Sequence, residues 1–299
     1  MFRGRALAAG ATQGQIEGEG ARRRLPVTCT IIAKDEADRI GRCIASVREL
    51  VDEVVVVDSG SCDETVAIAR SLGARVVHNA WPGYGPQKRF AEDQARNDWI
   101  LNLDADEWLP PRAQAEIAGF FAGGAPDLAG YRFRLETVYP HRDAPRPFAD
   151  YHAYVRLYDR RRCRFPNSLA FDAIAFDKVT MRDARAPVYH QTIRGLRHLL
   201  EKNKRYFLLQ SVEISRPKWK ALIRLPFEAP AVFLKYYLLR RHVTGGFFGL
   251  RFAATIAWLR VYRQLALAGF FPRATQAMRR SLSQEARAGQ GPGEARETE

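Results

Sequence analysis

The stretch WILNLDADEW, residues 99–108, decides how this chain is interpreted. An apolar run ends in three acids, Asp104, Asp106 and Glu107, that fall within four positions. Alternate residues of an extended segment point the same way, so Asp104 and Asp106 can face one ligand. Two carboxylates this close repel unless a cation lies between them, and Mg²⁺ or Mn²⁺ suits such oxygens. The alternative is that the acids favour the N-terminus of a helix beginning at Pro110.

The residues before this stretch alternate between short apolar strands and amphipathic helices. Strands are predicted near 27–33, 53–58, 74–79 and 98–104, with helices over 34–50, 61–73 and 83–96. Ser61 and Glu64 have the spacing of a capping box for the second helix. This order predicts an α/β fold with a doubly wound, mostly parallel sheet, in which ligands bind at the carboxyl ends of the strands. Asp58 ends the second strand at that edge.

Beyond residue 109 the pattern changes. It predicts a helix over 110–124, a strand over 129–139 and a hairpin with a basic turn over 152–165. From about residue 194 the chain is predicted to be helical, and it is rich in aromatic and basic residues.

Composition indicates a globular protein with an unevenly placed charge. Of the 299 residues, 46% are hydrophobic, enough for a core in one large domain or two small ones. The net charge is +14, but residues 182–280 hold twenty Lys or Arg against four Asp or Glu. The remainder is therefore nearly neutral, and the basic character belongs to the C-terminal third. The four cysteines show no metal or disulfide spacing, which favours a reducing compartment such as the cytoplasm.

These changes along the chain predict four segments. A flexible lead-in is expected over 1–24, an α/β domain over 25–192, a helical membrane-associating region over 193–281 and a disordered tail over 282–299. The apolar run in the lead-in is too short for a signal peptide.

The basic, aromatic C-terminal region suggests a partner. No window approaches 18 uncharged apolar residues, so a spanning helix is not expected. Aromatic residues mixed with Lys and Arg are typical of helices lying on an anionic membrane surface. The alternative is ordinary helices that pack on the α/β domain and present a solvated basic face. We find no DNA- or RNA-binding motif, so nucleic acid is not expected as a partner.

Four blocks of sequence resemble one family. They are VTCTIIAKDEADRIGRCIASV, EVVVVDSGSCDETVAIARSLGARVV, GYGPQKRFA and DWILNLDADEWL, which span about residues 26–112. They resemble the family 2 glycosyltransferases of GT-A fold, and most closely the bacterial lipopolysaccharide core β-glucosyltransferase group. The resemblance implies a GT-A nucleotide-sugar domain followed by the helical region.

The resemblance also implies roles for individual residues. Asp58 matches an acid that contacts the nucleotide base, Lys34 and Glu36 match the nucleotide-binding loop, and Gly85, Lys88 and Arg89 match a segment reaching the ribose and diphosphate. Asp104 and Asp106 match the DXD metal motif, and His190 matches a histidine that often completes the metal shell. Asp172 stands where relatives carry the acidic catalytic base, with Phe171 in place of a histidine.

The resemblance implies an inverting, metal-dependent glycosyltransferase at the inner face of the cytoplasmic membrane. Its donor would be UDP-glucose, and its acceptor a lipid-linked or lipopolysaccharide/envelope glycan. One alternative is a sugar nucleotidyltransferase, but that enzyme would carry a Gly-rich basic loop where this chain has AKDEADR, residues 33–39. The other is a non-catalytic basic protein that binds membranes or nucleic acid.

Overall fold

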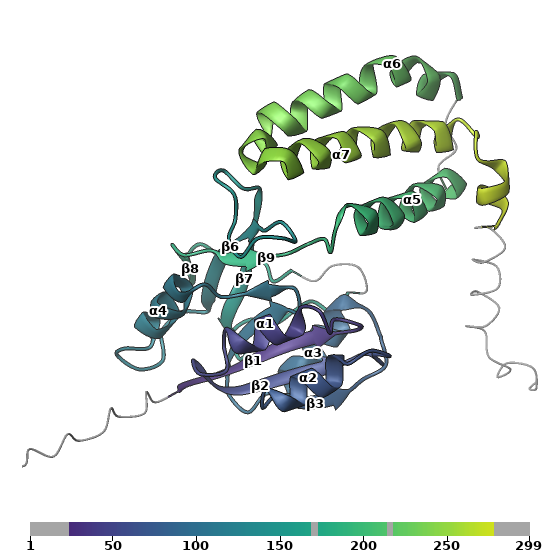
Figure 1. The fold of residues 1–299 in the computed structure, drawn as a ribbon. Coiled ribbons are helices and arrows are strands. Elements are labelled where there is room, and N and C mark those ends of the chain that lie inside the picture. The colour runs from purple at the N-terminus through teal and green to yellow at the C-terminus, as the bar shows by residue number, and fades with distance from the viewer. Residues whose placement is uncertain (1–23, 169–172, 214–217, 278–299) are drawn as a thin grey trace, which may run out of the picture.

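The structure is a computed structural model that describes residues 24–168, 173–213 and 218–277 (Figure 1). Phe171 and Asp172 lie outside the described residues, as do nearly all of the lead-in and the whole predicted tail. An α/β part and a separate group of long helices make up the described chain (Figure 1).

The first half of the α/β part confirms the predicted alternation. Its strands are β1 (Leu25–Ala33), β2 (Val51–Asp58), β3 (Arg75–His78) and β4 (Trp99–Asp104). The helices between them are α1 (Ile40–Ala45), α2 (Thr65–Ser71) and α3 (Tyr84–Gln94). All four strands are parallel, because each helix returns the chain to the same end of the sheet.

The predicted capping box is wrong. Helix α2 begins at Thr65, and Glu64 makes no side-chain capping bond. Asp63 instead accepts a hydrogen bond from the Thr65 amide at 3.0 Å. The Ser61 hydroxyl is used elsewhere, since it accepts a bond from the Asp35 amide at 2.9 Å. Ser61 therefore joins the loops after β1 and β2 rather than starting a helix.

The second half of the α/β part completes one mixed sheet. Its elements are β5 (Glu107–Trp108), α4 (Pro111–Phe120), β6 (Gly130–Thr137), β7 (Tyr151–Asp159), β8 (Met181–Asp183) and β9 (Val188–His190). The described strands form a nine-stranded sheet in the order β3-β2-β1-β4-β7-β6-β9-β5, with β8 beside β6. Strand β7 runs antiparallel to both β4 and β6.

The hairpin predicted over 152–165 is wrong. Residues 151–159 are the single strand β7, and no returning strand follows the basic turn among the described residues. Glu92 of α3 explains the difference, because it accepts bonds from Arg164 Nε at 2.6 Å and from the Phe165 amide at 3.1 Å. These bonds draw the chain away from the sheet and along α3.

Buried apolar strands form the core. Val27, Cys29 and Ile31 of β1 are fully buried and pack with Leu101 and Leu103 of β4 in the main cluster. The burial of these large apolar side chains is the main favourable term for the fold and makes the strand ends rigid.

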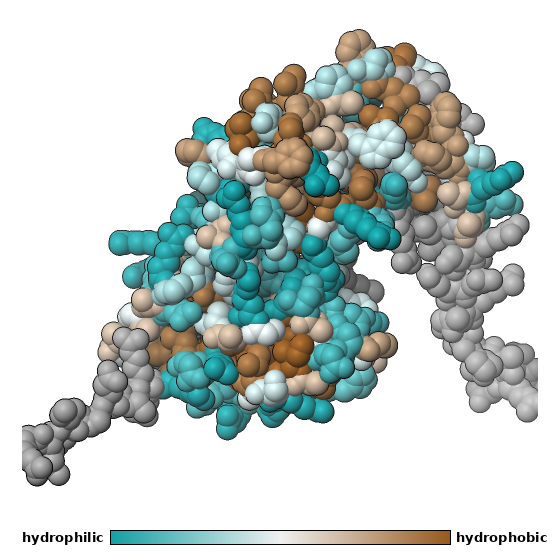
Figure 2. All heavy atoms as spheres, in the orientation of Figure 1, coloured by the Kyte–Doolittle hydropathy of each residue, from teal (hydrophilic) through white to brown (hydrophobic). Residues whose placement is uncertain are grey.

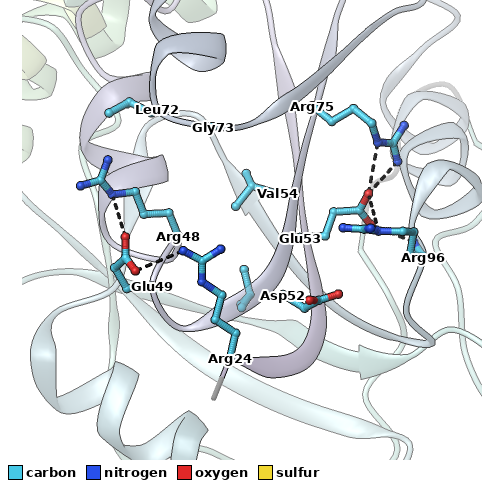
Figure 3. Close-up of a pocket in the computed structure, with 11 residues that line it drawn as sticks. Arg24, Arg48, Glu49, Asp52, Glu53, Val54, Leu72, Gly73, Arg75 and Arg96 are labelled. Carbon is cyan, nitrogen blue, oxygen red and sulfur yellow. Dashed lines mark hydrogen bonds and ion pairs between the residues drawn. The ribbon is translucent and has the colours of Figure 1, made fainter. Parts of the chain in front are cut away.

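A cavity of about 470 Å³ lies at the amino ends of the strands (Figure 3). Its arginines are paired with carboxylates. Glu53, which is 6% exposed, lies 3.0 Å from Arg75 Nη2 and 3.3 Å from Arg96 Nε, and it also accepts bonds from Thr28 Oγ1 and the Arg96 amide at 2.9 Å. We interpret these ion pairs as links that stabilise the packing of neighbouring strands.

The C-terminal helices are α5 (Leu196–Glu213), α6 (Lys218–Leu234), a π-helical turn η1 (Lys235–Leu239), a 3₁₀ turn η2 (His242–Gly245) and α7 (Gly246–Leu267). Helix α7 packs against both α5 and α6. Within the described ranges, we find no helix with the combined length and apolarity needed to cross a bilayer.

A buried arginine joins the helical group to the sheet. Arg146 lies between β6 and β7, is 4% exposed, and donates to the carbonyl groups of Arg240 and Arg241, both at 2.9 Å. Beside it, the Tyr139 hydroxyl lies 2.6 Å from His242 Nδ1, and His242 Nε2 lies 3.1 Å from Asp150. We call these residues, Tyr139, Arg146, Asp150 and His242, the Arg146 joint.

Candidate active site

Several of the predicted site residues lie at the carboxyl ends of three neighbouring strands, β2, β1 and β4. Strand register places Asp58 opposite Ala33 and Asp104 opposite Ile32. A cavity of about 360 Å³ opens at this edge. It is lined by Lys34, Glu36, Arg39, Trp81, Tyr84, Asp104, Asp106, His190, Thr192, Arg194 and His198, among others. The structure therefore brings five of the predicted residues to one cavity: Lys34, Glu36, Asp104, Asp106 and His190.

Two buried cations hold Asp104. Its carboxylate lies 3.0 Å from Lys88 Nζ and 3.1 Å from Arg156 Nη2. Lys88 comes from α3 and is 1% exposed, and Arg156 comes from β7 and is 4% exposed. Burial opposes ionisation of Asp104, but the charges of Lys88 and Arg156 outweigh it and lower the pKa of the carboxyl. Asp104 is therefore a carboxylate whose charge is already compensated.

Asp106 lies beside His190. The two meet because Glu107 of β5 pairs with His190 of β9, and the Gln191 amide donates to the Asp106 carbonyl at 2.9 Å. His190 Nε2 is 3.3 Å from Asp106 Oδ1, and Arg39 Nη1 is 3.3 Å from Oδ2. Burial alone lowers the pKa of His190, but the bond to Asp106 and the nearby carboxylates outweigh it and raise the pKa.

Glu107, the third acid, is fully buried behind the other two. It accepts a bond from Arg156 Nη2 at 2.6 Å and one from the Asp104 amide at 3.3 Å. Burial raises the pKa of Glu107, and the charge of Arg156 only partly offsets that effect. Glu107 thus helps to shape the turn that presents Asp104 and Asp106.

The residues at this edge could supply some of the ligands of a divalent ion. Asp106 and His190 offer one oxygen and one nitrogen at the cavity, whereas Asp104 is directed at Lys88 and Arg156. In the described part of the chain, no three His, Cys, Asp or Glu side chains are gathered as a ready metal site. Mg²⁺ commonly binds through one or two protein groups and completes its shell with substrate phosphates and water, so two protein ligands suffice here.

Sequence comparison assigns the family. The sequence model described as "Glycosyl transferase family 2" matches residues 28–184, which hold β1 to β8 and most of the residues above. The chain belongs to glycosyl transferase family 2. This membership confirms the predicted family, the α/β fold of GT-A type and the activity of a glycosyltransferase.

Two curated relatives and one solved structure illustrate the similarity. The chain is 37% identical to an uncharacterized glycosyltransferase of Rickettsia bellii (strain RML369-C) over 79% of this chain and 84% of that one. It is 28% identical to the lipopolysaccharide core biosynthesis glycosyltransferase LpsC of Rhizobium meliloti (strain 1021), over 82% and 94%. Glucosyl-3-phosphoglycerate synthase from Mycobacterium tuberculosis, crystallised with Mn²⁺, UDP and glucosyl-3-phosphoglycerate, is 26% identical over 40% of this chain and 45% of that one, with a TM-score of 0.30.

In this family 2 glycosyltransferase, Asp58 is bound by its own turn. It is 5% exposed, and its carboxylate accepts bonds from the amides of Gly60 at 2.9 Å and Ser61 at 3.0 Å. Asp58 is not among the residues that line the cavity. These hydrogen bonds fix the Asp58 side chain at the end of β2, the strand next to β1, which Lys34 follows.

Gly85 and Arg89 contact the chain segment 165–168. The Gly85 amide donates to the Ser168 carbonyl at 3.1 Å, and a Cβ at Gly85 would lie 2.2 Å from the Pro166 carbonyl oxygen. Arg89 Nη1 donates to the Phe165 carbonyl at 2.7 Å. That both reach the ribose and diphosphate stays a prediction, and in the structure both contact the segment that leads to residue 169.

Sequence reasoning missed three arginines at the candidate site. Arg156 bridges Asp104 and Glu107. Arg39 donates to Glu36 at 2.7 Å and to the Gln191 carbonyl at 3.0 Å, and Arg194 lies 3.1 Å from Glu36. Arg156 left one signal in the sequence, because a lone cation among buried apolar residues of a strand requires an anionic partner. Arg39 and Arg194 left no such signal in the sequence.

Proposed function

We propose that the chain is an inverting, metal-dependent glycosyltransferase that moves glucose from UDP-glucose to a lipid-linked or lipopolysaccharide/envelope glycan. The observation that carries the proposal is the cavity at the strand ends, where Asp106 lies 3.3 Å from His190. The similarity to LpsC, named for lipopolysaccharide core biosynthesis, supports the class of acceptor. Glucose and UDP come from the family resemblance.

The cations of the cavity support a diphosphate-bearing donor. Lys34, Arg39 and Arg194 line the cavity, and Lys88 is buried behind Asp104. Guanidinium and ammonium groups fixed around a phosphate stabilise the charge that builds up on a departing diphosphate. We assign Lys34, Glu36, Asp58, Lys88 and Asp104 to donor binding. The resemblance adds Gly85 and Arg89, which here support the site through the segment 165–168.

A divalent ion, Mg²⁺ or Mn²⁺, is assigned to Asp106 and His190, and Asp104 adds negative charge beside them. When bound, the ion would neutralise charge on the diphosphate leaving group. Arg39 lies 3.3 Å from Asp106 and orients that carboxylate. Because the pKa of His190 is raised, a proton competes with the ion for the imidazole, so binding of the ion should strengthen as the pH rises.

The transfer itself requires a base on the acceptor side. The base takes the proton of an acceptor hydroxyl, whose oxygen attacks the anomeric carbon opposite the diphosphate. The bond from the new oxygen to carbon forms as the bond from carbon to the phosphate oxygen breaks, so UDP departs and the configuration inverts. The resemblance names Asp172 as the base.

We place the enzyme in the cytoplasm, peripheral on the inner face of the cytoplasmic membrane. An envelope glycan built on a lipid is presented at a membrane, and the C-terminal third carries the basic and aromatic residues that favour an anionic lipid surface.

The proposal is tested by turnover of nucleotide sugars. The purified full chain should release UDP from UDP-glucose only with Mg²⁺ or Mn²⁺, and Asp106→Ala should reduce that rate by about 100-fold or more. Asp143→Ala is the matched control, because this exposed acid pairs only with surface Arg42 among the contacts described. Full activity of Asp106→Ala would refute the metal assignment. Absence of turnover with every nucleotide sugar would refute the function.

A further inference from the structure

The helices α6 and α7 and the turn between them expose large apolar side chains. Helix α6 exposes Trp219, Ile223 and Phe227, which are 59%, 61% and 71% accessible and are spaced four residues apart. Residues four apart lie on one face of a helix. Leu239, Phe247 and Trp258 of the following elements are 81%, 73% and 53% accessible. We call these six residues the α6–α7 surface, and Figure 2 shows the apolar colour concentrated over these helices.

The charge around this surface has one sign. Residues 218–273 contain ten Lys or Arg and a single acid, Glu228. Arg224, Lys235 and Arg251 are exposed next to the apolar side chains in sequence. Arg251 also lies 5.8 Å from the centroid of the Phe247 ring. Exposed aromatic and aliphatic groups surrounded by cations match the boundary between acyl chains and anionic headgroups.

The same charges argue against the other occupants. A second copy seated on this surface would bring two strongly basic surfaces together, which like-charge repulsion opposes. The helices also do not satisfy the requirements for crossing a bilayer in the described residues. An anionic lipid surface is the partner that is both apolar in depth and negative at its boundary.

The position of the surface suits an enzyme working at a membrane. Helix α7 packs between α5 and α6, so α6 forms the outer layer of the group (Figure 1). The Arg146 joint ties the turn between α6 and α7 to the segment after β6. In that segment the Val138 amide donates to the His190 carbonyl at 2.9 Å. Few bonds therefore separate the outer helices from the active site.

We infer that the α6–α7 surface docks on an anionic lipid bilayer and that the Arg146 joint holds the active site at a fixed position relative to that bilayer. This inference rests on the proposed function and specifies how the transferase meets a membrane-borne acceptor. The six apolar side chains enter the headgroup boundary, and the neighbouring cations contact the lipid phosphates.

Vesicle binding of the full chain tests the inference. The protein should sediment with phosphatidylcholine vesicles that contain phosphatidylglycerol, and not with phosphatidylcholine alone or at high salt. Arg224→Gln/Lys235→Gln/Arg251→Gln should weaken binding by about 100-fold, since each cation near the surface contributes about fivefold. The matched control, Arg112→Gln/Lys178→Gln/Arg185→Gln, removes three exposed cations of the α/β part and should change binding by about twofold or less.

An apolar set provides a second variant. Ile223→Ser/Phe227→Ser/Phe247→Ser should weaken vesicle binding by at least about tenfold, since each side chain loses apolar burial in the bilayer. Val179→Ser is its control, because Val179 is 89% accessible but lies in the α/β part. Sedimentation of the wild type with neutral vesicles as well, or equal binding by the variant sets and their controls, would overturn the inference. A wild-type dimer that the apolar set dissociates would overturn it too, in favour of a subunit interface.

Two further measurements separate this inference from the proposed function. Thermal stabilisation by UDP with Mn²⁺ and release of UDP from UDP-glucose are followed without vesicles. If the wild type fails to bind vesicles while both signals persist, the docking surface is wrong and the function stands. If vesicle binding behaves as expected and both signals are absent, the function is wrong and the docking surface stands.

Discussion

Replacing Arg156 by Met should destabilise the protein by about 3 kcal/mol, because it removes the cation shared by two carboxylates. Arg156 Nη2 lies 3.1 Å from Asp104 and 2.6 Å from Glu107, and both the arginine and Glu107 are buried. Breaking a buried ion pair from one side typically costs about 3–5 kcal/mol, since the remaining charge is left without compensation. Asp104 keeps Lys88 at 3.0 Å, so the cost falls on Glu107 and the lower end of that range applies.

The pH dependence of this loss tests its cause. Burial raises the pKa of Glu107, and removal of Arg156 raises that pKa further. When the pKa of a carboxyl is higher in the folded state than in the unfolded state, the protein loses stability as the pH rises from the unfolded-state pKa to the folded-state pKa. The deficit of Arg156→Met should therefore be small near the ordinary carboxyl pKa and grow toward neutral pH. Arg156→Met/Glu107→Gln should recover about 2 kcal/mol, because the uncompensated charge is gone.

Urea unfolding followed by fluorescence and circular dichroism measures these values, and coincidence of the two transitions checks that unfolding is two-state. Arg132→Met is the matched control. Arg132 makes a two-bond ion pair with Asp183 at 2.7 and 3.0 Å at the surface, and such pairs contribute about 1 kcal/mol or less. A loss below about 1 kcal/mol for Arg156→Met, or no rescue by Glu107→Gln, would refute the argument.

Three further predictions concern other parts of the molecule. Burial alone raises the pKa of Glu53, but bonds from the Arg96 amide, Arg75 and Thr28 outweigh it and lower that pKa. The stability that Glu53 contributes is therefore lost on acidification below the ordinary carboxyl range. Across that range the melting temperature should depend less on pH in Glu53→Gln than in the wild type. Arg146→Lys leaves an ammonium with three donors where the guanidinium serves four carbonyl groups in a fixed fork, so amide hydrogen exchange at η2 should rise while UDP release without vesicles stays within about twofold. Unchanged exchange would contradict this. His190→Ala should raise the Mn²⁺ concentration for half-maximal activity by about 10–100-fold, and titration at two pH values should show the wild type requiring less Mn²⁺ at the higher pH.

The first half of the fold was predictable because its signals are local. Strands β1, β2 and β4 are short and mostly buried runs, and the parallel order follows from the helices between the strands. The carboxyl-end rule then placed Asp104 and Asp106 at the site without any knowledge of distant contacts. The wrong hairpin over 152–165 shows the limit, because Glu92 redirects that chain from a helix 70 or so residues earlier.

The roles of charged residues were less predictable than their positions. That Lys88 reaches a diphosphate stays a prediction, and the structure adds that its buried ammonium group lies 3.0 Å from Asp104, which no local pattern indicated. Arg156 could not be assigned from sequence, since it meets Asp104 only through the pairing of β7 with β4. Long-range strand pairing decides which cation compensates which acid, and local patterns contain no information about it.

The acids of WILNLDADEW tolerate one another because the fold gives each a different environment. Asp104 remains charged between Lys88 and Arg156, Glu107 is buried with a raised pKa, and Asp106 opens onto the cavity beside His190. Asp106 is therefore the acid whose charge is least compensated by buried cations and the one best placed to take a metal ion. Substitutions should reflect this division: changes at Asp106 should act mainly on metal dependence, whereas changes at Glu107 should act mainly on stability. Equal effects of the two on both properties would mean that the three acids act as one cluster.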